Sequence, residues 1–153
     1  MGRDFMMKQS NQLAQGAAKQ QRTAGSFFHR LSNSTQLLFR GKAFLQGEAA
    51  EKIVDANSLI GKSDDYETGQ KYYARAVKLL RFAALKGASV DEKTHELLAD
   101  AYLGLAVCKW ANGQDDSAEL RNAILHANQA IWLNGTNQNA WSTKKEAARR
   151  LKG

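Results

Sequence analysis

Three histidines are the residues of this chain best suited to metal binding or proton transfer, and their spacing favours neither. His29, His95 and His126 lie in different segments, and none has a ligand-type partner four residues away. Because a metal site needs three or four converging nitrogen, oxygen or sulfur groups, we expect no metal site. The single cysteine, Cys108, lies in an apolar helical stretch, so we expect a buried packing residue and no internal disulfide.

The tripeptide Gly61-Lys62-Ser63 is similar to the end of a phosphate-binding loop. Such a loop needs a glycine five residues earlier, where this chain has Ala56, and it follows a strand, whereas this tripeptide follows a predicted helix. No G-x-S-x-G or comparable nucleophile motif is present. We therefore expect no catalytic residues, no cofactor and no enzyme activity.

Apolar residues recur with the 3.6-residue period of a helix from about Thr35 onward. We expect about five helices, covering residues 35–60, 66–86, 92–112, 116–134 and 137–151. Glycines 61 and 87 are expected to end the first two helices, and Ser89 with Glu92 to form a capping box for the third. Asn137 or Asn139 is expected to cap the last helix. Turns of four to six residues imply antiparallel neighbours, so the sequence predicts an all-α fold of antiparallel helix pairs.

The same periodicity predicts which side chains face the core. In the last helix the expected inward residues are Trp141, Ala148 and Leu151. In the first four helices they are Leu38, Leu45, Ala49, Ile53, Ala56, Ile60, Tyr73, Ala76, Val77, Leu80, Ala83, Ala84, Leu97, Leu98, Ala101, Tyr102, Leu105, Ala106, Lys109, Leu120, Ala123, Ile124, Ala127, Ala130 and Ile131.

The third and fourth helices carry a pattern of small and large residues at fixed spacing. It reads Tyr102-x2-Leu105-Ala106-x2-Lys109-x3-Gly113, then Ala123-x3-Ala127-x2-Ala130-x4-Gly135. This pattern resembles the tetratricopeptide repeat, with Ile53, Tyr102 and Trp141 at corresponding positions. These positions are 49 and 39 residues apart, whereas the family repeats about every 34 residues. The resemblance implies a degenerate, right-handed stack of helix pairs with insertions.

A second, weaker resemblance covers residues 45–112. Tyr66-Glu67, Tyr73, Ala76-Val77 and Ala83 are similar to the second helix of the microtubule-interacting-and-trafficking domain, a three-helix bundle. The fourth and fifth predicted helices favour the repeat interpretation, because a three-helix bundle leaves them without a role.

In the tetratricopeptide family, ligands lie on the concave surface of the first helix of each pair. The resemblance therefore implies a protein partner, bound there as a peptide or a helix, and an interaction adaptor or assembly subunit as the function. Trp110 and Trp132 lie late in their helices, where they either pack against neighbouring turns or anchor a partner. Carried over position by position, the partner-binding surface comprises Asp100, Leu103, Val107 and Trp110, with Glu51, Val54 and Ser58.

The net charge of +7 is concentrated at the two ends of the chain. Residues 1–42 hold seven basic residues against one acidic residue, and residues 141–153 hold five against one, whereas residues 43–140 hold ten against thirteen. We expect residues 1–34 to form a flexible basic arm and residues 35–153 to form the helical domain. The seven basic residues near the first end are Arg3, Lys8, Lys19, Arg22, Arg30, Arg40 and Lys42.

The basic ends support an alternative function, in nucleic-acid association or particle packaging, because Lys and Arg neutralise phosphates. A segment rich in Arg and Ser with one acidic residue is also typical of an organelle-import or export signal. Without such a role, we expect a cytoplasmic protein, since no apolar run approaches the roughly 20 residues that span a membrane. The partner, the biological process and the oligomeric state are left open by the sequence.

Overall fold

A computed structural model describes residue 37 and residues 40–153 of the chain. The predicted arm, residues 1–34, and the predicted core residue Leu38 lie outside this part. In the described part five helices follow one another: α3 (Lys42–Ser63), α4 (Tyr66–Ala84), α5 (Glu92–Ala111), α6 (Ser117–Leu133) and α7 (Gln138–Lys152).

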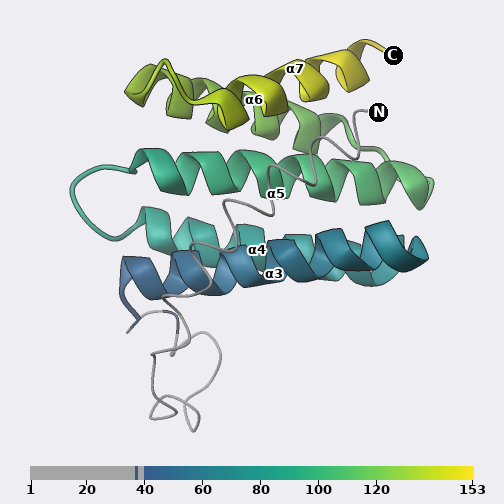
Figure 1. The fold of residues 1–153 in the computed structure, drawn as a ribbon, viewed down its shortest axis with the longest axis horizontal. Coiled ribbons are helices and arrows are strands. Elements are labelled where there is room, and N and C mark those ends of the chain that lie inside the picture. Colours follow the sequence, from purple (N-terminus) through teal and green to yellow (C-terminus); the bar gives the residue numbers. More distant parts are fainter. Residues whose placement is uncertain (1–36, 38–39) are drawn as a thin grey trace, which may run out of the picture.

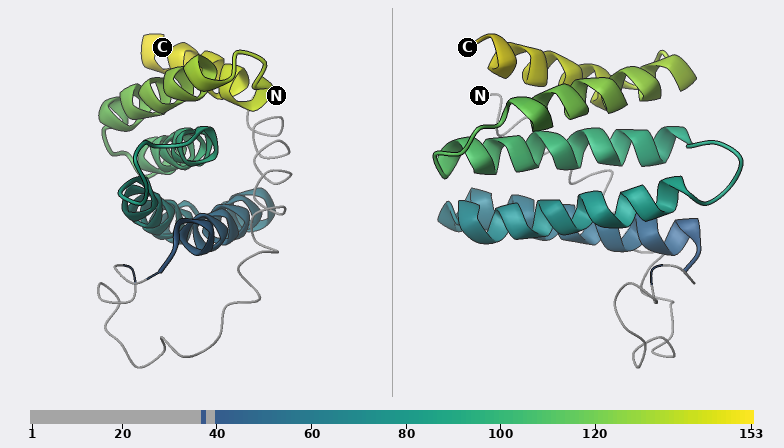
Figure 2. Two further views of the ribbon diagram at one scale, coloured as in Figure 1. Left: turned by 90° about the vertical axis from the view of Figure 1, so that its left-hand side faces the viewer. Right: turned by 180° about the vertical axis from the view of Figure 1, so that it is seen from behind.

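Each helix packs against the next one along the chain, and consecutive helices run in opposite directions (Figure 1). The third of them, α5, also contacts both α3 and α7. Seen along their axes in the left view of Figure 2, the helices follow an arc from α3 to α7. The expected all-α fold of sequentially packed helix pairs is thus confirmed for the described residues.

Two clusters of apolar side chains hold the helices together. The first joins α3, α4 and α5 around Tyr73 and includes the buried Cys108, as expected. Burial raises the pKa of the Cys108 thiol to about 12, so this side chain is a packing residue rather than a nucleophile. The second cluster joins α5, α6 and α7 and consists of Leu103, Ala106, Leu120, Ala123 and Ala147, with Tyr102 packed half-buried between the clusters.

The close approach of α4 and α5 depends on one glycine. A Cβ atom at Gly104 would overlap the ring of Tyr73. The Tyr73 hydroxyl in turn donates a hydrogen bond to the side-chain oxygen of Asn57 on α3, and both side chains are buried. One tyrosine therefore links three helices, and the residue facing its ring must be small.

Short polar side chains begin three of the helices, although one of them differs from expectation. Asn137 accepts a hydrogen bond from the Ala140 backbone N–H at 2.9 Å, which confirms the predicted cap of α7. The cap of α5 is Asp91, which accepts from the Thr94 N–H at 2.9 Å, so the predicted capping box starting at Ser89 is wrong. Asp91 directly precedes the first residue of α5, and it also accepts a hydrogen bond from the Gln46 amide on α3 at 3.3 Å.

The predicted end of the first helix is also corrected. Gly61 lies inside α3, which continues to Ser63 before Asp64 adopts a left-handed conformation with φ of 50°. Asparagine and aspartate tolerate this conformation better than most residues, so Asp64 makes the turn that Gly61 was expected to make. Gly87 does adopt a positive φ, of 100°, in the turn after α4.

Candidate protein-interaction surface

Most of the surface expected on α5 is not exposed. Leu103 and Val107 are buried, so the prediction that they are exposed apolar groups is wrong. The physical reason is that α5 is enclosed, with α3 and α4 on one side and α6 and α7 on the other. A helix segment that is apolar on nearly all sides is buried, and residues 97–108 of α5 contain only one charged residue, Asp100.

Asp100 is buried as well, and its contacts explain why. Its carboxylate accepts hydrogen bonds at 2.9 Å from the Asn139 amide and from the Thr143 hydroxyl, both on α7. Because a buried carboxylate must be satisfied by hydrogen bonds, Asp100 fixes the position of α7 on α5.

These contacts also set which face of α7 is buried. The side chains that face inward are those of Ala140, Thr143 and Ala147. The expectation for the last helix is therefore wrong, because Trp141 and Leu151 are exposed and Ala148 is only partly buried. Hydrogen bonds to Asp100 rotate the helix away from its most apolar residues.

The expected residues on α3 do not form an open surface with those on α5. Glu51, Val54 and Ser58 are all partly buried, and Val54 packs against the first apolar cluster. Of the seven residues predicted to bind a partner, only Trp110 is largely exposed, at 67% of its reference area. The predicted set is therefore divided among three buried residues of α5, three partly buried residues of α3 and one exposed tryptophan.

Exposed apolar side chains gather instead on α6 and α7. Trp132 is 86% exposed and its neighbour Leu133 is 51% exposed, both in the last turn of α6. Trp141, in the first turn of α7, is 45% exposed. Sequence reasoning placed Trp141 in the core and omitted Leu133. One feature of the sequence indicates that Leu133 is exposed: the dipeptide Trp132-Leu133 stands directly before the Asn134-Gly135 turn. At the end of a helix few neighbouring turns are available to cover a side chain.

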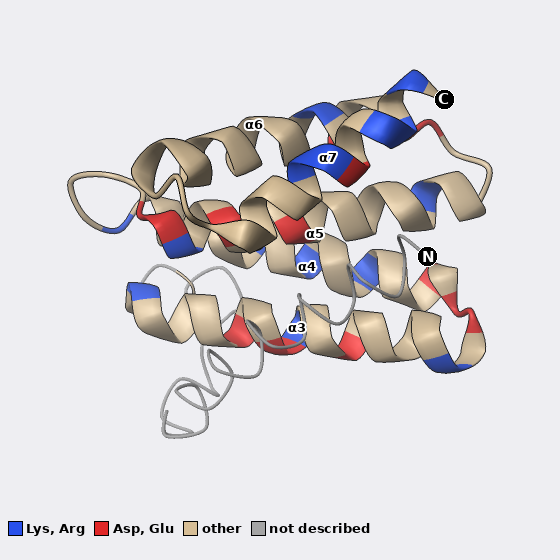
Figure 3. Cartoon of the chain, turned by 45° about the horizontal axis from the view of Figure 1, so that its top comes forward, with Lys and Arg blue, Asp and Glu red and all other residues tan. Residues whose placement is uncertain are grey.

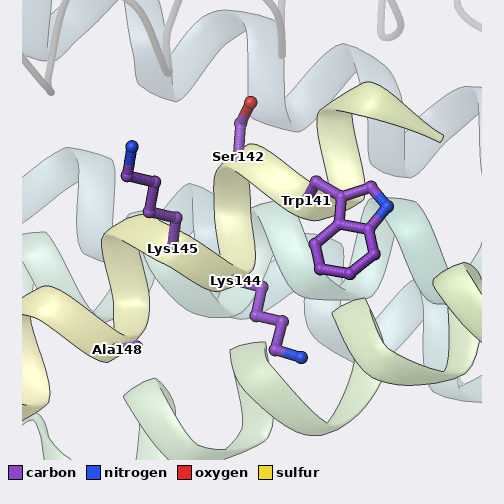
Figure 4. Close-up of a pocket in the computed structure, with 5 residues that line it drawn as sticks. All are labelled: Trp141, Ser142, Lys144, Lys145 and Ala148. Carbon is purple, nitrogen blue, oxygen red and sulfur yellow. The ribbon is translucent and has the colours of Figure 1, made fainter. Parts of the chain in front are cut away.

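A shallow hollow of about 390 Å³ lies on the outer side of α7 (Figure 4). The Trp141 ring is held at one end, because its Nε1 donates a hydrogen bond to the Gly135 carbonyl at 2.9 Å. The Lys144 ammonium lies 5.3 Å from the centroid of that ring, a cation–π contact. The residues lining the hollow are Trp141, Ser142, Lys144, Lys145 and Ala148.

The charge of α7 is strongly basic, with Lys and Arg along its length and a single acidic residue (Figure 3). That residue, Glu146, accepts hydrogen bonds from Arg149 at 2.6 Å and from Arg150 at 2.8 Å. These bonds, that from Arg149 first, hold the pKa of Glu146 below its ordinary value. Both arginines are therefore bound to Glu146. The cations that line the hollow are those of Lys144 and Lys145.

Two of the three histidines meet between α5 and α6. The Nδ1 atoms of His95 and His126 lie 3.0 Å apart. Among the described residues, no group of three His, Cys, Asp or Glu side chains is placed to hold a metal ion. In the same part of the chain, no helix has both the length and the apolar character needed to cross a membrane.

Comparisons with known proteins assign no family to the chain. It matches no protein-family model, and no curated protein or solved structure is significantly similar to it. The surface of α6 and α7 is therefore the basis on which a function is proposed.

Proposed function

We propose that this chain is a protein-interaction adaptor or assembly subunit whose partner contacts the apolar side chains at the turn between α6 and α7. The observation that carries the proposal is the exposure of Trp132, at 86%, next to the half-exposed Leu133. Tryptophan is the residue type most enriched among those that dominate binding energy at protein interfaces. Covering such side chains removes apolar area from water, which favours association.

The proposed scaffold is a tetratricopeptide-like, right-handed stack. Sequential antiparallel packing of α3 to α7 is compatible with it, and so is the close helix contact at Gly104. The proposed binding surface differs from the concave set expected from this resemblance, because Leu103 and Val107 support the core. The end of the stack replaces its concave side as the contact surface.

Affinity capture followed by mass spectrometry tests this proposal. The full chain and the variant Trp132→Ser/Leu133→Ser are used as baits. The variant should capture at least about tenfold less of a specific partner, since interface anchors of this type are worth 2 kcal/mol or more. Its melting temperature should stay close to that of the unmodified chain, because exposed substitutions usually change stability by less than about 0.5 kcal/mol.

Leu85→Ser provides the matched control, since Leu85 is 75% exposed but belongs to the end of α4 and not to α6 or α7. It removes exposed apolar area and should leave capture unchanged. Loss of capture by Trp110→Ser, with the double variant still active, would move the site to the end of α5. Equal capture by all variants would contradict the proposal.

Nucleic-acid binding is the second candidate function, and the basic residues of α7 favour it. The seven basic residues expected to contribute from the other end include Arg40 and Lys42 in the described part; Lys42 pairs with Asp91 at 3.4 Å, and Arg40 lies over the ring of Phe44. Binding of this kind should fall steeply with salt, because each phosphate contact releases counterions. A titration that detects no binding to single-stranded RNA at about 50 mM salt would exclude it.

A further inference from the structure

We infer that the hollow on α7 binds an acidic peptide segment, with one apolar side chain of the peptide on Trp141 and Ala148 and its carboxylates on Lys144 and Lys145. This inference rests on the proposed function, since it names the chemistry of the partner segment. It adds a binding site on α7 to the apolar contact at the preceding turn.

The spacing of the lining residues places them on one face of the helix. Trp141, Lys144, Lys145 and Ala148 stand at the first, fourth, fifth and eighth positions of a helical run, which share a face. The aromatic ring and the Ala148 methyl group supply the apolar part of this face. A volume of about 390 Å³ lies near the lower limit of small-molecule pockets, so it suits one side chain of a peptide.

The two lysines give the face its charge preference. Figure 4 shows the Lys144 side chain beside Trp141 and the Lys145 side chain pointing in the opposite direction. Cations therefore stand on both sides of the apolar strip. Glu146 does not oppose an incoming carboxylate, because Arg149 and Arg150 bind it. A segment with Asp or Glu on either side of one apolar residue complements this pattern in both charge and polarity.

Three other occupants fit the same face less well. The segment of this chain before α3 is itself basic, with a net charge of +5 over residues 1–41, so Lys144 and Lys145 repel it. Single-stranded nucleic acid is usually bound by several aromatic side chains on which successive bases stack, and this hollow has one. A second copy of the chain would have to present an acidic face. On α3, Glu48 pairs with Arg75 at 3.9 Å and Glu51 is partly buried, so that of the three carboxylates there only Asp55 is exposed.

Fluorescence anisotropy with a defined probe tests the inference. The probe is a short labelled peptide with one phenylalanine between Asp and Glu residues. Two further probes are the same peptide with Ala in place of Phe, and a labelled single-stranded oligonucleotide of similar charge. The full chain should bind the first probe about tenfold or more tightly than the second. The variant Lys144→Glu/Lys145→Glu should lose binding of the first probe by about tenfold or more.

Lys71→Glu/Lys78→Glu is the matched control, because it makes the same change in net charge at two exposed positions of α4. This control should keep most of the affinity, and circular dichroism should show that both double variants remain folded. Equal loss in both variants would overturn the inference in favour of general electrostatic attraction. Tighter binding of the oligonucleotide would overturn it in favour of nucleic acid. Concentration-dependent dimers in sedimentation that disappear in Lys144→Glu/Lys145→Glu would overturn it in favour of a second copy.

The inference and the proposed function fail separately. If Lys144→Glu/Lys145→Glu binds the probe normally while Trp132→Ser/Leu133→Ser loses its captured partner, the adaptor function stands and the acidic-peptide site is wrong. If the probe result is as expected and capture does not depend on Trp132, the peptide site stands and the apolar contact at the turn is wrong.

Discussion

His126 on α6 contacts two side chains of α5, His95 and Tyr102, and its contact with His95 requires at least one of the two imidazole rings to be neutral. Its Nδ1 lies 3.0 Å from that of His95, and its ring stacks on Tyr102 with centroids 5.6 Å apart. Burial, followed by the charges of His95 and Arg81, lowers the pKa of His126 to about 4. Burial also lowers the pKa of His95, although Asp91 opposes this change. Since histidine in an unfolded chain titrates near 6.5, the unfolded state binds more protons between about pH 6.5 and pH 4.

Stability should therefore decrease as the pH falls from about 6.5 to about 4. A pKa difference of this size corresponds to about 3 kcal/mol for a fully buried ring, and because His126 is partly exposed we expect about 1–2 kcal/mol. Urea unfolding at about pH 7 and about pH 4.5 measures the change. His126→Gln should lose less stability between these two conditions than the unmodified chain. The same loss in both proteins would assign the pH dependence to another group, such as His95, whose pKa burial also lowers from its ordinary value.

At the scale of the helices, the contact between α4 and α5 is limited by Gly104. Gly104→Ala should destabilise the fold, because the added methyl group overlaps the Tyr73 ring. Overpacking of this kind costs about 1–3 kcal/mol, whereas alanine gains about 1 kcal/mol over glycine in a helix. Because the overlap with the ring is severe, we expect the strain to exceed the gain, with a net loss of up to about 2 kcal/mol in thermal or urea unfolding.

Gly69→Ala is the control for this prediction. Its Cβ would lie 3.3 Å from the Ile60 side chain, which is tight but can be relieved by a small movement of that side chain. The gain in helix propensity should then offset the strain and keep stability within about 1 kcal/mol of the unmodified chain. If Gly104→Ala is as stable as Gly69→Ala, the close packing of α4 on α5 is not as described.

The helices and most of their inner faces could be predicted from local pattern, because period and caps are local properties. Tyr73, Leu97 and Leu120 are buried as expected, and Asn137 caps α7. The orientation of α7 could not be predicted, since Asp100 on another helix determines it. Local apolarity favoured Trp141 and Leu151 as core residues, whereas tertiary hydrogen bonds bury alanines. The sequence left open whether Trp132 packs or anchors a partner, and it placed Trp141 in the core, because the exposure of both follows from how α6 and α7 pack.

At the scale of the whole molecule, the larger apolar core lies among α3, α4 and α5, whereas most of the exposed large apolar side chains lie on α6 and α7. The α3–α5 part contains the larger cluster around Tyr73, whereas α6 and α7 add a smaller cluster made mostly of alanines. The inward positions of α6 and α7 are mostly alanines. Large apolar residues of these two helices, Trp132 and Trp141 among them, face outward. Five of the seven large apolar side chains exposed in the described part lie on α6 and α7: Leu125, Trp132, Leu133, Trp141 and Leu151. This distribution is why we place partner binding at this end of the molecule.

Site-specific photo-crosslinking tests that placement most directly. A photoreactive phenylalanine analogue is introduced at Asn128, which is exposed one helical turn before Trp132, or at Ser58, which belongs to the surface expected from the repeat resemblance. After irradiation of the full chain with its captured partner, the analogue at position 128 should cross-link the partner and the analogue at position 58 should not. Cross-linking from position 58 alone would contradict a binding surface on α6 and α7.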